Sequence, residues 1–241
     1  MKTVLIIGDS YGVPNYRDLY PEYKVTVNPD THIEFLLRKN YKVYNASKNG
    51  AGNIEAIERA KDYLSGKSIE HPAVILNQEI QIDVANPKVD WCIWFHTEPF
   101  RNYKFNKKET LYQALYNSVK IQYDLFVDFV QTLECKTIVI GGQCKILPYL
   151  FEIHQPNYCI EDWKSLILNE QLPECYFLSD PKTWIENIND DNETKLKYIE
   201  NYFIIIEKLK QSEEFPDNGH PGPKAHYWLY NQITHLIDNY R

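Results

Sequence analysis

The chain alternates short, continuous apolar runs with longer segments whose apolar positions recur every three or four residues. The runs are rich in β-branched and aromatic residues, which is typical of strands buried on both faces of a parallel sheet. Four such strands are predicted, at Thr3–Ile7, Tyr41–Asn45, Asp90–Phe95 and Lys136–Ile140. A further short strand is expected near Cys175–Leu178, within a stretch (145–190) that otherwise has no clear periodicity.

Helices are predicted between these strands. The sequence Thr31-x-x-Glu34 is a capping box, and it opens a helix with one apolar face. Four more helices are expected: one that follows the Gly/Asn-rich turn 46–53 and runs to about Leu64, and three others over roughly 108–133, 193–209 and 224–238. The spacing places Ile54 on the core side of the first of these, and His226 is expected on the surface of the last.

Strands that alternate with helices call for a parallel sheet that is covered on both faces. The predicted fold class is therefore α/β, a three-layer α/β/α sandwich with a central parallel sheet of about five strands. The sequence has no internal repeat, low-complexity tract or linker-like stretch, so residues 1–241 are expected to form a single domain.

Composition excludes several function classes. The chain has 241 residues, with 26 Lys plus Arg against 33 Asp plus Glu, a formal net charge of −7 that argues against general nucleic-acid binding. No apolar run approaches the ~20 residues of a membrane span. The five cysteines include no CxxC pair, which argues against a disulfide framework or a zinc site. The first apolar run is too short for a signal peptide and lacks a cleavage site, so we expect a cytoplasmic protein. The sequence does not indicate its oligomeric state.

The first strand ends in Gly8-Asp9-Ser10. Ligands of open α/β sheets bind beyond the carboxyl ends of the strands, so Ser10 lies where a reacting serine would be useful. The alternative is structural: Gly8 permits a sharp turn, and Ser10 or Asp9 caps the next helix. Asp9 is expected to hold the turn or to cap a helix rather than to react.

A hydroxyl nucleophile needs a base, and the base needs an orienting carboxylate. Asp217-x-x-His220 supplies both on one loop, stiffened by neighbouring prolines. A zinc site formed by Asp217, His220 and His226 is the less favoured alternative, because the spacing already has this explanation.

In these motifs the chain resembles the SGNH, or GDSL-type, hydrolases, which are three-layer α/β/α esterases and lipases of flavodoxin-like topology. Gly8-Asp9-Ser10 matches the nucleophile motif of that family, and Asp217-Asn-Gly-His220-Pro matches its acid and base motif. The second block of the family, an Asn followed five residues later by an oxyanion-hole Gly, is matched by Asn45 and Gly50. The resemblance spans the whole chain, with the motifs in order.

The third block departs from the family. Where an Asn usually donates to the oxyanion, this chain has His96-Thr97-Glu98-Pro99, and an ionised carboxylate cannot donate a hydrogen bond. Three hypotheses are open: Thr97, Asn102 or Arg101 donates instead, burial keeps Glu98 protonated, or the site is impaired. We further expect Glu98 to be held by Arg101 or another cation, and His96 to be structural.

The resemblance implies a serine ester hydrolase that acts on a carboxylic ester, such as an O-acetyl or another short acyl group. Ser10 would be the nucleophile, His220 the base and Asp217 its orienting acid. The N–H groups of Ser10 and Gly50 would hold the oxyanion, with Thr97, Glu98 and Arg101 at the edge of the pocket. The expected substrate is a small-molecule or glycan ester, with no cofactor and no metal. The alternative is a catalytically weakened relative that binds a glycan or a protein.

Overall fold

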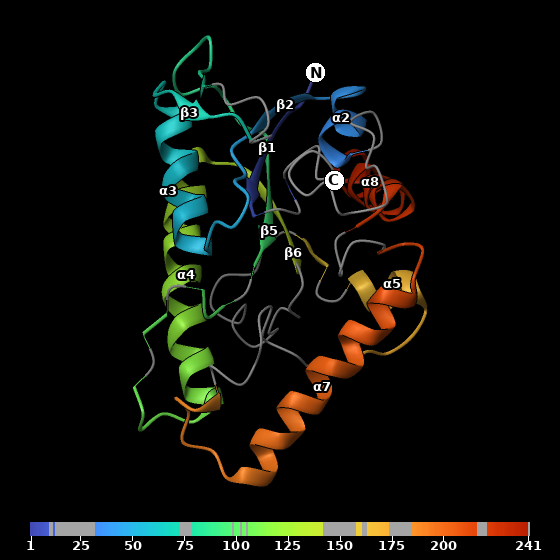
Figure 1. Ribbon diagram of the computed structural model, residues 1–241. Helices are drawn as coiled ribbons and strands as arrows, with labels where there is room; N and C mark the ends of the chain where they lie inside the picture. Colours follow the sequence, from blue (N-terminus) through green and yellow to red (C-terminus); the bar gives the residue numbers. More distant parts are fainter. Residues whose placement is uncertain are drawn as a thin grey trace.

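The computed structural model describes residues 1–9, 12, 32–72, 79–97, 99–101, 103–104, 106–141, 158–160, 163–173, 185–215 and 221–240. Its centre is a sheet of five strands in the order β2-β1-β5-β6-β7, and every neighbouring pair is parallel (Figure 1). The strands are β1 (Thr3–Gly8), β2 (Lys42–Asn45), β5 (Trp91–His96), β6 (Lys136–Gly141) and β7 (Tyr158–Ile160). Counted along this sheet alone, the order is 2-1-3-4-5, which is the flavodoxin-like arrangement. The predicted fold class is confirmed.

The described helices are α2 (Ile33–Arg38), α3 (Asn53–Leu64), α4 (Leu111–Leu133), α5 (Trp163–Leu168), α7 (Asn192–Gln211) and α8 (Pro223–Asn239). A small antiparallel sheet, β3 (Ile69–Glu70) with β4 (Glu79–Ile80), was not predicted from the sequence. Its strands are only two residues long, so they carry no periodic signal. A capping box formed by Thr110 and Gln113 begins α4.

Helices cover both faces of the sheet, because successive residues of a strand point to opposite sides. Val4 and Ile6 of β1 belong to a core shared with α2 and α8, whereas Leu5 and Ile7 belong to a core shared with α3. Figure 1 shows α3 and α4 on one side of the sheet and α2 and α8 on the other. All four of these strand residues are fully buried, as the continuous apolar run predicts.

Three local predictions need correction. The N-cap of α2 is His32, whose side chain accepts from the Glu34 N–H, so this helix begins one residue later than the predicted capping box places it; Thr31 lies outside the described residues. Ile54 is 43% exposed, because the buried stripe of α3 runs through Ala56, Ile57 and Ala60 instead. The fifth strand, β7, lies in the stretch expected to be irregular, and the expected strand at 175–178 lies outside the described residues.

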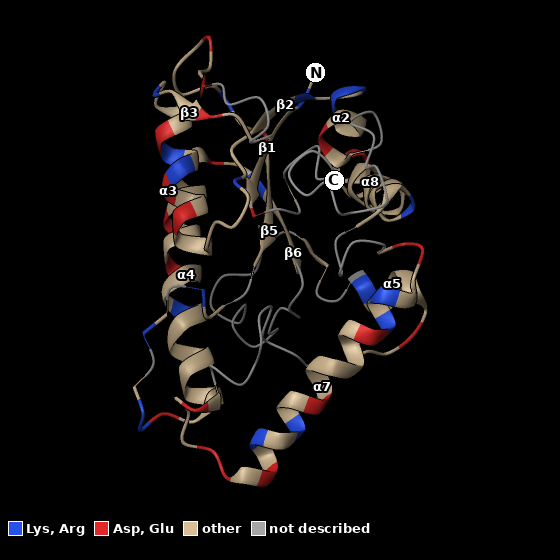
Figure 2. Ribbon diagram, in the orientation of Figure 1, with Lys and Arg blue, Asp and Glu red and all other residues tan. Residues whose placement is uncertain are grey.

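Side chains of both charges are interspersed along α3 and α7 (Figure 2). On α3, Lys61 pairs with Glu58 at 2.8 Å, and Glu55 pairs with Lys48 at 2.9 Å. These side chains are about half exposed, so each pair contributes at most ~1 kcal/mol to stability. The pairs describe a solvated helix face.

Candidate active site

The end of β1 passes unusually close to β5. Gly8 has φ +144°, and a Cβ at this position would lie 2.7 Å from Cβ of Phe95. A side chain would therefore clash with the neighbouring strand as well as strain the backbone. Glycine at position 8 is required by this close approach.

The segment after β1 turns back on itself. The Gly12 N–H donates to the Asp9 carbonyl at 3.0 Å, and the Asp9 carboxylate accepts from the Thr97 hydroxyl at 2.5 Å. Asp9 is 1% exposed. The structure therefore supports the prediction that Asp9 holds the turn. Ser10 lies outside the described residues.

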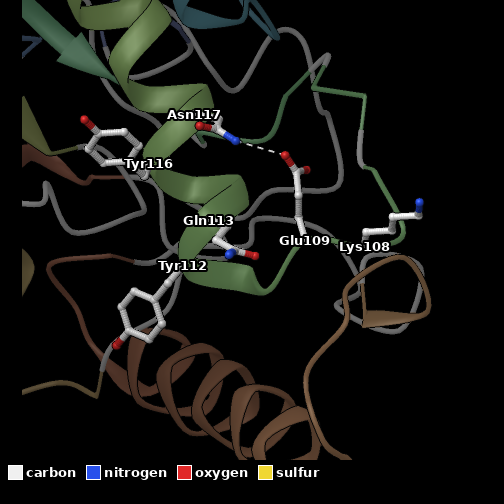
Figure 3. A pocket seen from close by; sticks show the side chains of 6 residues that line it. All are labelled: Lys108, Glu109, Tyr112, Gln113, Tyr116 and Asn117. Carbon is white, nitrogen blue, oxygen red and sulfur yellow. Dashed lines mark hydrogen bonds between the residues drawn. The ribbon is translucent and has the colours of Figure 1, made fainter.

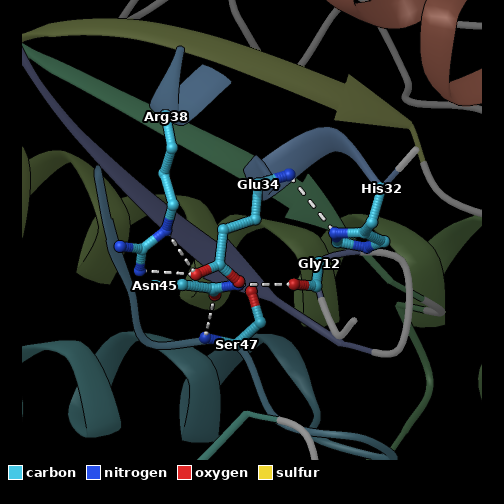
Figure 4. Close-up of polar contacts among 6 residues, drawn as sticks. All are labelled: Gly12, His32, Glu34, Arg38, Asn45 and Ser47. Carbon is cyan, nitrogen blue, oxygen red and sulfur yellow. Dashed lines mark hydrogen bonds and ion pairs between the residues drawn. The ribbon is translucent and has the colours of Figure 1, made fainter. Parts of the chain in front are cut away.

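Asn45 joins the second motif to the first (Figure 4). Its Nδ2 donates to the Gly12 carbonyl at 2.7 Å, and its Oδ1 accepts from the Ser47 N–H at 2.9 Å. A Cβ at Gly12 would overlap the Ser47 hydroxyl and lie 2.8 Å from its Cβ, so this contact requires glycine. Sequence reasoning missed Gly12, because the residue that it contacts, Ser47, is supplied by a distant segment of the chain.

A buried carboxylate lies behind Asn45. Oε2 of Glu34 accepts from Asn45 Nδ2 at 2.7 Å, and Oε1 accepts from Arg38 Nη2 at 2.7 Å and Nε at 3.0 Å (Figure 4). Glu34 is 5% exposed, whereas half of the Arg38 side chain is exposed. A buried charge is tolerated when it is paired and hydrogen-bonded, and this one is both. From the sequence, Glu34 was predicted only as part of a capping box.

The third motif is anchored through buried groups. His96 ends β5 and is 4% exposed, as expected for a structural histidine, and burial lowers its pKa to about 4. Thr97 is 1% exposed, and its N–H donates to Asn53 Oδ1 at 2.9 Å. Glu98 lies outside the described residues, so its pairing with Arg101 stays a prediction.

Arg101 lies against the second motif. Its Nη1 donates to the Ala51 carbonyl at 3.0 Å, and the side chain is half-buried. The preceding Gly50 has φ +75° and is exposed, and the Ala51 N–H closes the turn by donating to the Lys48 carbonyl at 3.1 Å. The structure thus brings two predicted site residues, Gly50 and Arg101, to one place.

The acid and base motif, Asp217 and His220, lies outside the described residues. The residues around it are described: the Gly222 N–H donates to the Glu214 carbonyl at 2.8 Å, so the chain leaves and re-enters this loop at one point.

His226 was predicted on the surface, and that prediction is wrong. It is 2% exposed, and its ring lies 4.5 Å from the ring of His32, centroid to centroid. Burial, together with charge repulsion from His32, lowers the pKa of His226 well below its ordinary value. The signal was present, because His226 shares the buried stripe of Leu229, Ile233 and Ile237.

These contacts form a continuous path from α8 to the segment after β1. His226 packs on His32, His32 accepts from the Glu34 N–H, Glu34 binds Asn45, and Asn45 binds Gly12. His226 follows the predicted base by six positions, and Gly12 follows the predicted nucleophile by two. The flanks of the two motifs are therefore linked through buried polar groups, with each link in direct contact with the next.

A separate hollow of about 670 Å³ lies over the first turns of α4 (Figure 3). It is lined by Lys108, Glu109, Tyr112, Gln113, Tyr116 and Asn117. Glu109 accepts from Asn117 Nδ2 at 2.9 Å, while Tyr112 and Tyr116, 55% and 47% exposed, lie one helical turn apart. The hollow contains none of the predicted site residues.

Across the residues with described placement, no group of three or more His, Cys, Asp or Glu side chains is arranged to hold a metal ion. Nor, among the described helices, is any both long and apolar enough to cross a membrane.

No family model and no curated protein matches the sequence. Among solved structures, the chain is similar to an M. smegmatis aryl esterase at 12% identity and a TM-score of 0.45, covering 98% of this chain and 100% of that one. It is similar to a carbohydrate acetylesterase family member from Sinorhizobium meliloti at 10% identity and a TM-score of 0.44, covering 99% of this chain and 100% of that one. A third likeness is to a carbohydrate esterase described as having divergent catalytic and non-catalytic binding functions, at 13% identity and a TM-score of 0.46, covering 99% of this chain and 65% of that one.

The fold is assigned from the strand order of the chain itself. A parallel sheet in the order β2-β1-β5-β6-β7, with helices on both faces, is the three-layer α/β/α architecture implied by the resemblance to the SGNH hydrolases.

Proposed function

We propose that the chain is a serine hydrolase that cleaves a carboxylic ester with Ser10, His220 and Asp217. The observation that carries the proposal is the convergence of three strand-end segments. Asp9 is bonded to Thr97, Gly12 to Asn45, and Arg101 to Ala51. Segments after β1, β2 and β5 thus meet at the carboxyl edge of the sheet, where open α/β folds bind their ligands.

In the proposed reaction, Ser10 Oγ attacks the acyl carbon and His220 takes the serine proton. The bond between the acyl carbon and the alcohol oxygen breaks, and His220 returns the proton to the leaving alcohol. Water then attacks the acyl-serine with His220 as base, which releases the acid and restores Ser10. Asp217 orients the His220 ring throughout.

The oxyanion is assigned to the N–H groups of Ser10 and Gly50, with Arg101 as a further donor. Gly50 is exposed, and its turn is fixed by the bond between Ala51 and Lys48. Arg101 uses Nη1 on the Ala51 carbonyl, and a guanidinium has five N–H groups in all. A fixed donor next to Gly50 supports the hypothesis that Arg101 compensates for Glu98 in the third motif.

The proposed substrate is a small-molecule or glycan ester with a short acyl group, and the mechanism needs no metal or organic cofactor. The test is turnover of p-nitrophenyl esters from acetyl to octanoyl, together with labelling by a fluorophosphonate probe. We expect the probe to modify Ser10, and Ser10→Ala to lower kcat about 10⁴-fold or more. Retained turnover in a clean Ser10→Ala preparation would rule out this mechanism.

A second candidate function, glycan binding without turnover, is favoured by the hollow over α4. Tyr112 and Tyr116 present half-exposed rings on one side of α4, and Gln113 and Asn117 add side-chain amides to the lining of the same hollow (Figure 3). Aromatic faces pack on apolar faces of sugars while amides bond hydroxyl groups. Two results together would favour this alternative. The probe would not label Ser10, and the protein would bind a glycan with micromolar affinity that Tyr112→Ala and Tyr116→Ala remove.

A further inference from the structure

We propose that Asn53 is a positioning residue for the reaction, acting through Thr97 on the segment that carries Ser10. The inference rests on the proposed function and extends it to a residue outside the motifs that suggested that function.

Asn53 holds both backbone groups of one residue. It is the first residue of α3, and its Oδ1 accepts from the Thr97 N–H at 2.9 Å while its Nδ2 donates to the Thr97 carbonyl at 3.3 Å. Thr97 directly follows β5, so the amide acts there as a neighbouring strand would. Asn53 and Thr97 are both almost fully buried. The side-chain amide therefore fixes the backbone where the chain leaves the sheet.

Thr97 passes this constraint to the first motif. Its hydroxyl donates to the Asp9 carboxylate at 2.5 Å, and the Asp9 carbonyl accepts from the Gly12 N–H at 3.0 Å. Ser10 is the residue after Asp9. A shift of Thr97 would move the group that holds Asp9, and displacements of about 1 Å at reacting groups are enough to slow an enzyme substantially.

A side chain of α4, Gln122, in turn fixes the side-chain amide of Asn53. Its Nδ2 donates to Gln122 Oε1 at 2.8 Å, and Gln122 Nε2 donates to the Pro99 carbonyl at 2.8 Å and to Ser118 Oγ at 2.9 Å. The Ser118 hydroxyl also donates to the Pro99 carbonyl. One network therefore holds Thr97 and Pro99, the residues on either side of Glu98.

The side chains in this network are polar, which suits a role in fixing the geometry of the strand ends better than a role in filling the core. Asp9, Asn53, Thr97, Ser118 and Gln122 are each less than 5% exposed. Burying polar groups is costly unless they are satisfied, and an apolar contact between α3 and α4 would avoid that cost. A network so fully bonded defines one geometry for the two strand ends.

Two sets of variants test the inference. Asn53→Leu removes both bonds to Thr97, and Thr97→Val removes only the hydroxyl that binds Asp9, whereas Thr97→Ser retains it. The matched control is Ile57→Ala, which destabilises the same helix at a fully buried position outside the network.

We expect Asn53→Leu and Thr97→Val to lower kcat about 10–100-fold while KM changes by about twofold or less. In the Ile57→Ala control, kcat should also change by about twofold or less. Probe labelling of Ser10 should slow in parallel, and Thr97→Ser should restore most of kcat. Backbone hydrogen exchange over residues 95–101 should accelerate in Asn53→Leu more than in Ile57→Ala.

The inference is overturned if Asn53→Leu matches Ile57→Ala in kcat and in exchange, or if Thr97→Val retains wild-type kcat. Failure of the proposed function looks different, because turnover would then persist in Ser10→Ala. In that case the exchange measurement by itself decides whether Asn53 orders residues 95–101.

Discussion

The guanidinium of Arg101 donates to the carbonyl oxygen of Ala51 across 3.0 Å, although fifty positions separate the two residues in the chain. This bond fixes the segment after β5 to the turn that contains Gly50. It leaves the remaining N–H groups of a half-buried cation beside the proposed oxyanion donor.

Arg101→Ala should lower kcat/KM for p-nitrophenyl acetate about 100-fold, the usual scale for losing one oxyanion donor. The matched control is Lys104→Ala, which removes the same charge from an exposed position three residues on. An Arg101→Ala variant that behaves like the control contradicts the assignment. If Glu98→Asn also leaves turnover and stability unchanged, residues 96–101 are only a connector.

Gly50→Ala should lower the free energy of unfolding by about 1–2 kcal/mol, because its φ of +75° is a left-handed conformation that disfavours a side chain. Apart from its two chain neighbours, no heavy atom of the described residues lies within 4 Å of the position that Cβ would take, so the expected cost comes from the backbone conformation. Gly50→Asn should cost less, since Asn adopts this conformation more readily. Urea unfolding measures both, and equal losses would show that the cost is not conformational.

Arg38→Ala should lower the free energy of unfolding by about 2 kcal/mol or more, because it leaves the buried Glu34 carboxylate without its cation. Lys39→Ala is the control, since it removes the next cation in the chain from an exposed position. Urea denaturation of both variants gives the comparison. A loss no larger than that of Lys39→Ala would mean that Asn45 and solvent suffice for this carboxylate.

The pH dependence of stability should carry a contribution from His96. Burial lowers its pKa from 6.5 to about 4, so between these values the unfolded chain binds a proton that the folded chain does not. The free energy of unfolding therefore falls as the pH decreases through this window, by about 2 kcal/mol from pH 7 to pH 5 for this one group. His226, whose pKa is also lowered by burial, acts in the same direction.

The measurement is urea unfolding from pH 7 to pH 5 in the wild type and in His96→Gln. The variant should lose less stability over this range, since the group that titrates has been removed. His235→Gln, at an exposed position of α8, should retain the wild-type slope. Equal slopes in all three proteins would contradict the assignment to His96.

The sequence by itself determined the architecture and the meeting point of the three strand-end segments. Continuous apolar runs such as Thr3–Ile7 are long enough to identify buried parallel strands. The carboxyl ends of parallel strands share one edge, so residues that follow β1, β2 and β5 had to lie near one another. Gly50, Thr97 and Arg101 could be placed at that edge for this reason.

Only the tertiary structure decided which polar groups are buried and which partners they have. The apolar spacing assigned Ile54 to the core, and the polar character of its ring assigned His226 to the surface, and both assignments are wrong. Asn53 and Thr97 are forty-four positions apart, and nothing local in either stretch indicates a pairing. A buried amide or carboxylate is stable only beside groups supplied by other elements, and the packed helices and strand ends determine which groups those are.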